Sequence, residues 1–283
     1  MTALNMQPLE PCLTAALFRP LSEQLVTLLR GLAPADWERP TVSPQWRLRD
    51  VAAHLLDGQL RRISVQRDRH LTPPDGPIAS ERDLAAFINR LNAGGVAYSA
   101  RLSTRLITDL LEVAAEWLAA DIANLDPHGP AVFPVSWAGE STSENWMDIG
   151  REYTEHWHHQ MQIRDAVAKP RLLEPKWMAP LLDLSVRALP HAYEGVAASA
   201  GSVVTLQVSG ETSGAWSIVR DTNGWQLRRG RPAQPDATVS VSADDAWRMF
   251  YNALAGDALA ERVKVEGKTD LAAPLLRARS VIV

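Results

Sequence analysis

The first 170 residues are dominated by long stretches in which apolar side chains recur at helical spacing, separated by loops rich in proline and glycine. Each stretch has one apolar stripe, which must be buried against another element. Four such stretches are predicted, and they cover residues 9–32, 46–67, 80–125 and 143–168. Four amphipathic helices in one chain predict a bundle, and bundles build ligand and metal sites from side chains that face each other across the interior.

The third stretch carries the clearest local signals. Ser80, with Asp83 three residues later, has the form of a capping box and predicts the start of a helix. The pair Gly94-Gly95 is expected to bend or split this helix. The helical period then continues to about Leu125, where a run containing two prolines ends it.

The pattern changes after a further helical segment at 175–193. Short alternating runs predict strands at 203–208, 215–219, 225–227 and 238–241. Asn223-Gly224 predicts a hairpin between the second and third strands. Ser242, with Asp245 three residues later, predicts a helix through Ala255. A last strand at 263–265 and a helix at 269–276 complete the chain. The expected fold is α + (α+β), with a helical bundle in 1–172 and a smaller α+β domain in 173–283.

Charge and cysteine content narrow the classes of function. The 283 residues contain 29 Lys+Arg and 33 Asp+Glu, a net charge of −4, whereas domains that neutralise nucleic-acid phosphates are usually strongly basic. Nucleic acid is therefore not an expected partner. Cys12 is the only cysteine, which excludes an internal disulfide and a cysteine-ligated zinc site. We find no signal peptide and no apolar run of about 18 residues, so we expect a cytoplasmic protein without a membrane partner. A monomer or a homodimer is expected.

The densest group of side chains that can bind a metal lies at 151–159. Glu155 and His159 are four residues apart and share one helix face, and so do Glu152 and His156. The two pairs are offset by about 60°, so only one of them can point into the bundle. A third ligand must come from another helix, and His54 is the obvious donor. Taken separately, a histidine such as His54 is more often a core residue, and Glu155 with His159 could be an exposed pair.

Two segments resemble a known family at this point. The segments 46–55, WRLRDVAAHL, and 155–166, EHWHHQMQIRDA, resemble the two signature segments of the mycothiol-dependent maleylpyruvate isomerase family, a branch of the DinB-like metal-binding four-helix bundles. The resemblance implies a divalent metal, most often Zn²⁺, bound by His54, Glu155 and His159. Residues 263–273 resemble the sterol carrier protein-like domain that is often attached. Family members often carry an acidic residue where this chain has Gln162, so a role of that residue in orienting a ligand could be altered.

The resemblance also implies a chemistry. Three protein ligands leave a fourth position open, as in catalytic zinc sites, and a thiol bound there is deprotonated at neutral pH. Because Cys12 lies upstream of the bundle motifs, the implied nucleophile is a cofactor thiol, which in the family is mycothiol. With a small maleylpyruvate-like substrate the reaction would be conjugate addition, rotation about the resulting single bond, and elimination to the trans isomer. Transfer of the thiol to other electrophiles would depend on the same deprotonation of a metal-bound thiol.

A dianionic substrate would also need cationic partners. The bundle candidates are Arg47, Arg151 and Arg164, with Arg61 a further one, although solvation at the surface is the alternative for each. Arg228 and Arg229 are candidates from the second domain. His156 and His158 are expected to flank the ligand face. The packing residues are expected to include Trp46, Trp146, Trp157 and Trp247. Asp57, one turn beyond His54, could hydrogen-bond a ligand histidine or be solvated.

Two function classes remain beside a thiol-dependent isomerase or transferase. One is a non-catalytic protein that holds a metal structurally and an apolar ligand in its second domain, and bound lipid in the purified protein would favour it. The other is a hydrolase that uses zinc-bound water, and turnover without a thiol would favour that.

Overall fold

The structure, a computed structural model, describes residues 6–282. The chain forms two compact units. A helical unit contains residues 13–134 and 142–171, and a second unit contains the described residues up to Cys12, Val135–Ser141 and Leu172–Ile282. Two segments inside the range expected for the bundle thus belong to the second unit. That each unit folds as an independent domain, divided at residue 172, remains a prediction.

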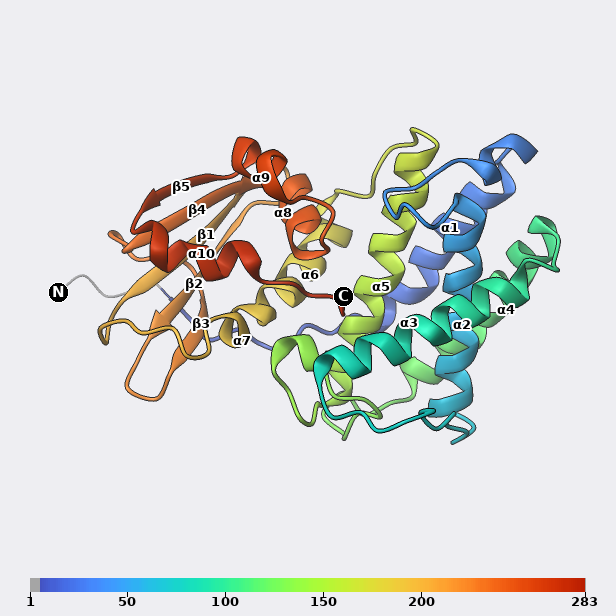
Figure 1. The fold of residues 1–283 in the computed structure, drawn as a ribbon, viewed down its shortest axis with the longest axis horizontal. Coiled ribbons are helices and arrows are strands. Elements are labelled where there is room, and N and C mark those ends of the chain that lie inside the picture. The colour runs from blue at the N-terminus through green and yellow to red at the C-terminus, as the bar shows by residue number, and fades with distance from the viewer. Residues whose placement is uncertain (1–5, 283) are drawn as a thin grey trace. The chain divides into compact units, whose positions relative to one another are not determined.

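The helical unit confirms the expected bundle (Figure 1). Four of its helices pack on one another, with a further helix, α3, against α2. The helices are α1 (Phe18–Arg30), α2 (Leu48–Gln66), α3 (Glu81–Ser99), α4 (Thr104–Ala123) and α5 (Asn145–Ala166). Short 3-10 turns precede α1 at Ala15–Leu17 and α2 at Pro34–Glu38.

Gly94-Gly95 was expected to bend or split the third helix, and the structure shows no split there. Helix α3 runs through both glycines, and the break before α4 falls at residues 100–103. Gly95 instead allows α3 to approach α2, because a Cβ there would lie 2.2 Å from Cγ of Asp57. The Ser103 hydroxyl caps α4 by accepting a hydrogen bond from the Leu106 backbone N–H at 3.2 Å. The predicted cap at Ser80 is confirmed, since its hydroxyl accepts from the Asp83 backbone N–H.

Helix α5 is buried along most of its length. Its large apolar side chains, Tyr153, Trp157 and Met161, are fully buried. Full burial of one such side chain contributes about 1.5–3 kcal/mol, so α5 anchors the bundle. The same helix carries carboxylates and imidazoles into the interior, where charged groups are stable only when paired or bound to a metal. We therefore expect the polar site of the bundle, an ion-pair network or a metal site, to be built on α5.

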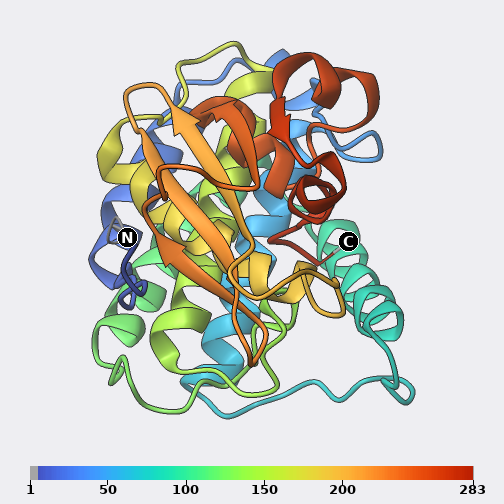
Figure 2. The ribbon, with the colours of Figure 1, turned by 90° about the vertical axis from the view of Figure 1, so that its left-hand side faces the viewer.

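The second unit is built on a five-stranded mixed sheet with strand order β3-β2-β1-β4-β5. The strands are β1 (Val203–Ser209), β2 (Gly214–Arg220), β3 (Trp225–Arg229), β4 (Ala237–Ser242) and β5 (Lys264–Gly267). Strands β1 and β4 pair in parallel, and the other neighbours are antiparallel. Figure 2 shows these strands towards the viewer. The predicted Asn223-Gly224 hairpin is confirmed, and Gly224 has the positive φ of 140° that favours glycine.

The second unit also contains helices, of which α8 and α10 contact both β1 and β4. They are α6 (Pro175–Ser185), α7 (Leu189–Ala192), α8 (Ala243–Phe250), α9 (Gly256–Arg262) and α10 (Thr269–Arg277). The helix expected through Ala255 ends at Phe250, and α9 was not expected. The expected fold class, a helical bundle followed by a smaller α+β unit, is confirmed.

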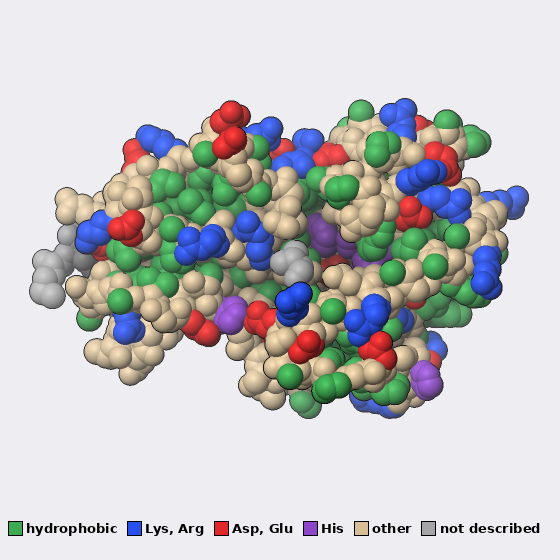
Figure 3. Space-filling view, in the orientation of Figure 1, with side chains coloured by type: hydrophobic (Ala, Val, Ile, Leu, Met, Phe, Trp, Pro, Cys, Tyr) green, Lys and Arg blue, Asp and Glu red, His purple; other side chains and the backbone are tan. Residues whose placement is uncertain are grey.

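Acidic and basic side chains are interspersed over the face shown in Figure 3, in keeping with the net charge of −4. Among residues 6–282, no helix is both long and apolar enough to cross a membrane.

Candidate metal centre

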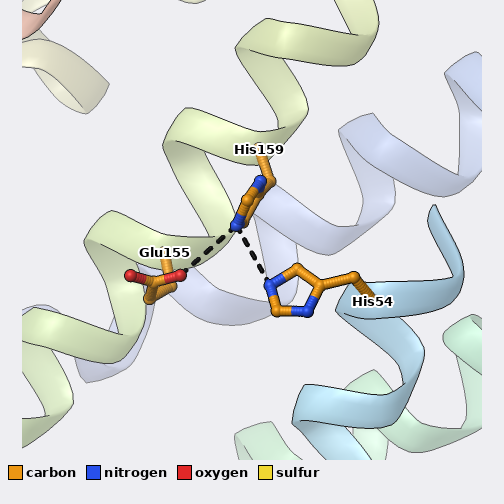
Figure 4. Close-up of side chains that lie close together, drawn as sticks. All are labelled: His54, Glu155 and His159. Atoms are coloured by element: carbon orange, nitrogen blue, oxygen red, sulfur yellow. Dashed lines mark hydrogen bonds and ion pairs between the residues drawn. The ribbon is translucent and has the colours of Figure 1, made fainter. Parts of the chain in front are cut away.

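Two helices of the bundle bring three candidate ligands together (Figure 4). His54 projects from α2, and Glu155 and His159 project from consecutive turns of α5. The Nε2 atoms of His54 and His159 are 3.1 Å apart, and Nε2 of His159 is 3.4 Å from Oε2 of Glu155. One ligand atom from each residue lies within 4.8 Å of the other two. These are the three residues that the sequence analysis singled out.

The second pair on α5 faces a different environment. The expectation that only one pair can point into the bundle is wrong, because Glu152 and His156 are also buried, with 7% of each residue exposed. His156 Nε2 lies 3.5 Å from Oε1 of Glu152, and the His156 ring packs edge-on against Phe18 at 5.5 Å. Glu152 also accepts a hydrogen bond from Arg151 at 3.3 Å. Glu152 and His156 therefore form a buried polar pair beside the cluster and are not part of it.

The electrostatics of the cluster favour metal-binding forms of its side chains. Burial, and then the neighbouring His159, lower the pKa of His54 well below its ordinary value, so this imidazole is neutral at pH 7 and has a lone pair to donate. Burial raises the pKa of Glu155, but the contact with His159 and the nearby histidines outweigh it and leave the pKa well below the ordinary range. Glu155 is therefore a carboxylate under all working conditions.

The spacing of the donor atoms fits a tetrahedral metal ion. Bonds of about 2.0–2.1 Å to nitrogen and oxygen place the ligand atoms of such an ion about 3.3 Å apart. The separations of 3.1 and 3.4 Å from His159 are close to that value. Two imidazoles and a carboxylate form a donor set that suits zinc and related divalent ions. The residues present therefore fit the metal that the resemblance implies.

Aromatic rings enclose the two imidazoles. The Trp46 ring lies 4.9 Å from the ring of His54 and 6.4 Å from that of His159. The His158 ring lies 4.0 Å from that of His159, and its Nδ1 is 2.9 Å from the carbonyl oxygen of Thr154. His158 is thus held beside the cluster by its own helix, in the flanking position that the sequence analysis expected.

The hydrogen bonds to the two imidazoles differ from those that the sequence suggested. Asp57 does not reach His54 but pairs with Arg61, its Oδ2 lying 2.7 Å from Nε. The Nδ1 atom of His54 has no hydrogen-bond partner among residues 6–282. His159 has one, because its Nδ1 lies 2.9 Å from Oε1 of Gln162. Sequence reasoning noted Gln162 as a departure but did not assign this contact, although a spacing of three residues on a helix could have indicated it.

The candidate substrate-binding arginines have different surroundings. Arg151 is part of a buried ion-pair network with Asp148 and Glu152, and those carboxylates raise its pKa against the opposing effect of burial. Arg164 donates to the Pro170 carbonyl at 2.8 Å. Arg47 precedes α2, contacts Glu38, and has a side chain that is 62% exposed.

Both candidate arginines from the second unit, Arg228 and Arg229, lie on β3. The contacts of Arg229 are the informative ones. Arg229 pairs with the buried Asp183 of α6. Asp183 also accepts a hydrogen bond from the Trp216 indole at 3.3 Å. These contacts link the sheet to α6 and give Arg229 a structural role in this unit.

The fold and the cluster define a class of protein. Its members have a helical bundle followed by an α+β unit, and the interior of the bundle brings two histidines and a glutamate together. A profile of the mycothiol maleylpyruvate isomerase N-terminal domain matches residues 18–164, just over half of the chain. The protein therefore belongs to this family, and all three residues of the cluster lie within the matched range.

Two solved structures of one enzyme share the fold. The structure of the mycothiol-dependent maleylpyruvate isomerase covers 89% of this chain and 91% of its own, with a TM-score of 0.54 and 14% identity. A histidine-to-alanine variant of that enzyme matches over the same shares with a TM-score of 0.52 and 14% identity. The sterol carrier protein 2 like 2 of Aedes aegypti covers 34% of the chain and 93% of its own, with 19% identity and a TM-score of only 0.28. No curated protein matches the sequence.

Proposed function

We propose that the protein is a divalent-metal-dependent isomerase that uses a low-molecular-weight thiol, mycothiol or a close analogue, to isomerise maleylpyruvate-like substrates. The observation that carries the proposal is the convergence of His54, Glu155 and His159 inside the domain that defines the family. Zn²⁺ is the ion we propose, because the donor set and its spacing suit a tetrahedral site with one open position. A metal there would lower the pKa of a thiol bound at the open position and so supply a thiolate at neutral pH.

The side chains of the cluster perform separate tasks. His54 and His159 donate nitrogen lone pairs from two different helices, which holds the site rigid across the bundle. Glu155 supplies the one negative charge of the set, so that a divalent ion retains a net positive charge towards an incoming thiol. Trp46, which lies against both imidazole rings, shields them from water on one side.

The substrate's carboxylates need a cation that can be reached. We propose Arg47 for one of them, because its guanidinium is exposed and it directly follows Trp46 in the chain. Arg151 and Arg164 are engaged within the bundle, and we propose that they support the helices instead.

The protein's own thiol does not suit the role of nucleophile. Cys12 belongs to the second unit, and burial, followed by the negative charge of Asp183, raises the pKa of its thiol to about 11. A shift of two units from the ordinary value of 9.0 lowers the thiolate fraction at pH 8 about 100-fold. The nucleophile must therefore come from a cofactor.

Cys12 is accordingly expected to react slowly with iodoacetamide. In the folded protein the rate at pH 8 should be about 100-fold below that of the same thiol in urea, and it should still be rising above pH 10. Mass spectrometry of samples quenched over time measures both rates. Equal rates in the folded and unfolded chains would contradict the assignment and return Cys12 to the list of candidate nucleophiles.

The function is tested by measuring turnover of maleylpyruvate with and without metal and thiol. The purified protein should contain about one metal ion per chain, and the Co²⁺ form should gain a thiolate-to-metal absorption band when mycothiol is added. Formation of the trans isomer should require both metal and thiol, and the thiol should be recovered unchanged. A stable thiol adduct as the final product would indicate a transferase, and turnover without thiol a hydrolase. Absence of both metal and turnover would contradict the proposal.

A further inference from the structure

We propose that Gln162 is the positioning residue of the metal site, which holds His159 in the tautomer that presents Nε2 to the ion. The inference rests on the proposed function and extends it to a residue that does not itself contact the ion. Gln162 would fix the orientation of the His159 ring and, as an amide, would bring no negative charge to Nδ1 of that ring.

Geometry assigns the tautomer. Gln162 lies three residues after His159 on α5 and is buried, with 9% of its surface exposed. Its Oε1 atom lies 2.9 Å from Nδ1 of His159. An amide oxygen only accepts hydrogen bonds, so Nδ1 carries the proton. The lone pair of a neutral His159 is then on Nε2, the atom that faces His54 and Glu155.

A cation in the cluster suits this arrangement. When His159 carries its single proton on Nδ1, Nε2 has no hydrogen to donate to Oε2 of Glu155, only 3.4 Å away. A lone pair and a carboxylate oxygen at that distance repel each other unless a positive charge lies nearby. A metal ion supplies that charge, and Gln162 is what keeps the proton of His159 on the far side of the ring.

The amide of Gln162 also determines the charge next to Nδ1 of His159. A carboxylate in this position would make the imidazole more basic and bind the metal more tightly. Gln162 orients His159 without adding a negative charge, which leaves Glu155 as the single anion among the four residues. The expected effects of two substitutions at 162 therefore have opposite signs. Removal of the acceptor weakens metal binding, whereas conversion of the acceptor to a carboxylate strengthens it.

The same helix provides a matched control. Gln160 is fully buried, and neither of its amide atoms has a hydrogen-bond partner within residues 6–282. It lies two residues from Gln162 and on a different face of the helix. Gln160→Met thus removes a buried amide of the same size from α5 without touching His159.

The test compares the affinity of Gln162→Met, Gln162→Glu and Gln160→Met for Zn²⁺ and Co²⁺, by competition with a chromophoric chelator. Gln162→Met should bind about 10–100-fold more weakly than the wild type, the usual cost of losing a residue that orients a ligand. Gln162→Glu should bind as tightly as the wild type or more tightly, and Gln160→Met should match the wild type. Circular dichroism and unfolding midpoints of the metal-free proteins report whether each variant folds.

The outcomes separate this inference from the proposed function. If the wild type binds no metal, or binds it with no dependence on His159, the proposed function fails. If the wild type binds metal through His159 but Gln162→Met binds equally well, only the role of Gln162 is overturned. A loss of affinity in Gln162→Glu equal to that in Gln162→Met would also overturn it, because rescue by another acceptor is what distinguishes positioning from packing.

Discussion

Alanine in place of His54, Glu155 or His159 is expected to abolish both metal binding and isomerisation, whereas His156→Ala should retain both. Each of the three substitutions removes one of the donor atoms that converge within 4.8 Å. Two protein ligands are too few to hold a divalent ion in a catalytic site. Affinity should fall by more than about 100-fold, since that is already the upper range for residues that only orient a ligand. Activity at a fixed metal concentration should fall with it.

His156 is the matched control for these variants. It has the same chemistry and the same burial as His159, and it also has a glutamate four residues before it. Only its direction differs, because it packs against Phe18 and pairs with Glu152. Elemental analysis, chelator competition and turnover should be measured on all four variants. Equal loss in His156→Ala, or full metal content in any ligand variant, would contradict the site.

The ligand set could be predicted because helical spacing is a local property. Glu155 and His159 had to share a face of α5, and the offset of Glu152 and His156 followed from the same periodicity. The partner on another helix did not follow from spacing alone. His54 was the obvious donor, and the resemblance of residues 46–55 supported that choice. The structure places that histidine opposite the pair.

What the sequence could not provide depends on contacts between helices. Gly94-Gly95 carries the same signal whether glycine breaks a helix or lets two helices approach, and only the proximity of Asp57 decides between them. Asp57 itself was a candidate partner of His54 until Arg61 was seen to hold it. Such choices between partners are set by tertiary packing, and periodicity does not contain them.

The sequence analysis did not predict the buried ion-pair network of the bundle. Arg62 of α2 and Arg151 of α5 both contact Asp148, at 2.7 Å each. Asp148 is fully buried, and the side chain of Arg62 is 3% exposed. In the sequence, Arg62 is one of several polar residues in an amphipathic stretch, and nothing marks it as interior. Its burial becomes visible only when α5 brings a carboxylate to it.

Replacement of Asp148 by leucine should therefore cause the largest loss of stability among single substitutions in this network. The change leaves the buried guanidinium of Arg62 without its ion-pair partner, and the partly buried guanidinium of Arg151 keeps its contact with Glu152. Removal of one partner of a buried ion pair costs about 3–5 kcal/mol, because the remaining charge is neither solvated nor paired. The free energy of unfolding should be measured in urea on chelator-treated protein, so that loss of metal does not contribute.

A double variant separates loss of charge balance from loss of packing. Arg62→Met combined with Asp148→Leu removes one charge of each sign and leaves Arg151 paired with Glu152. Most of the lost stability should return, because apolar residues of similar volume often replace a buried pair at little cost. Asp109, an exposed carboxylate on α4 whose arginine contacts are 3.8 Å long, provides the surface control, and Asp109→Ala should leave the unfolding midpoint unchanged. A double variant no more stable than Asp148→Leu alone would show that the shape of the aspartate, and not its charge, supports the bundle.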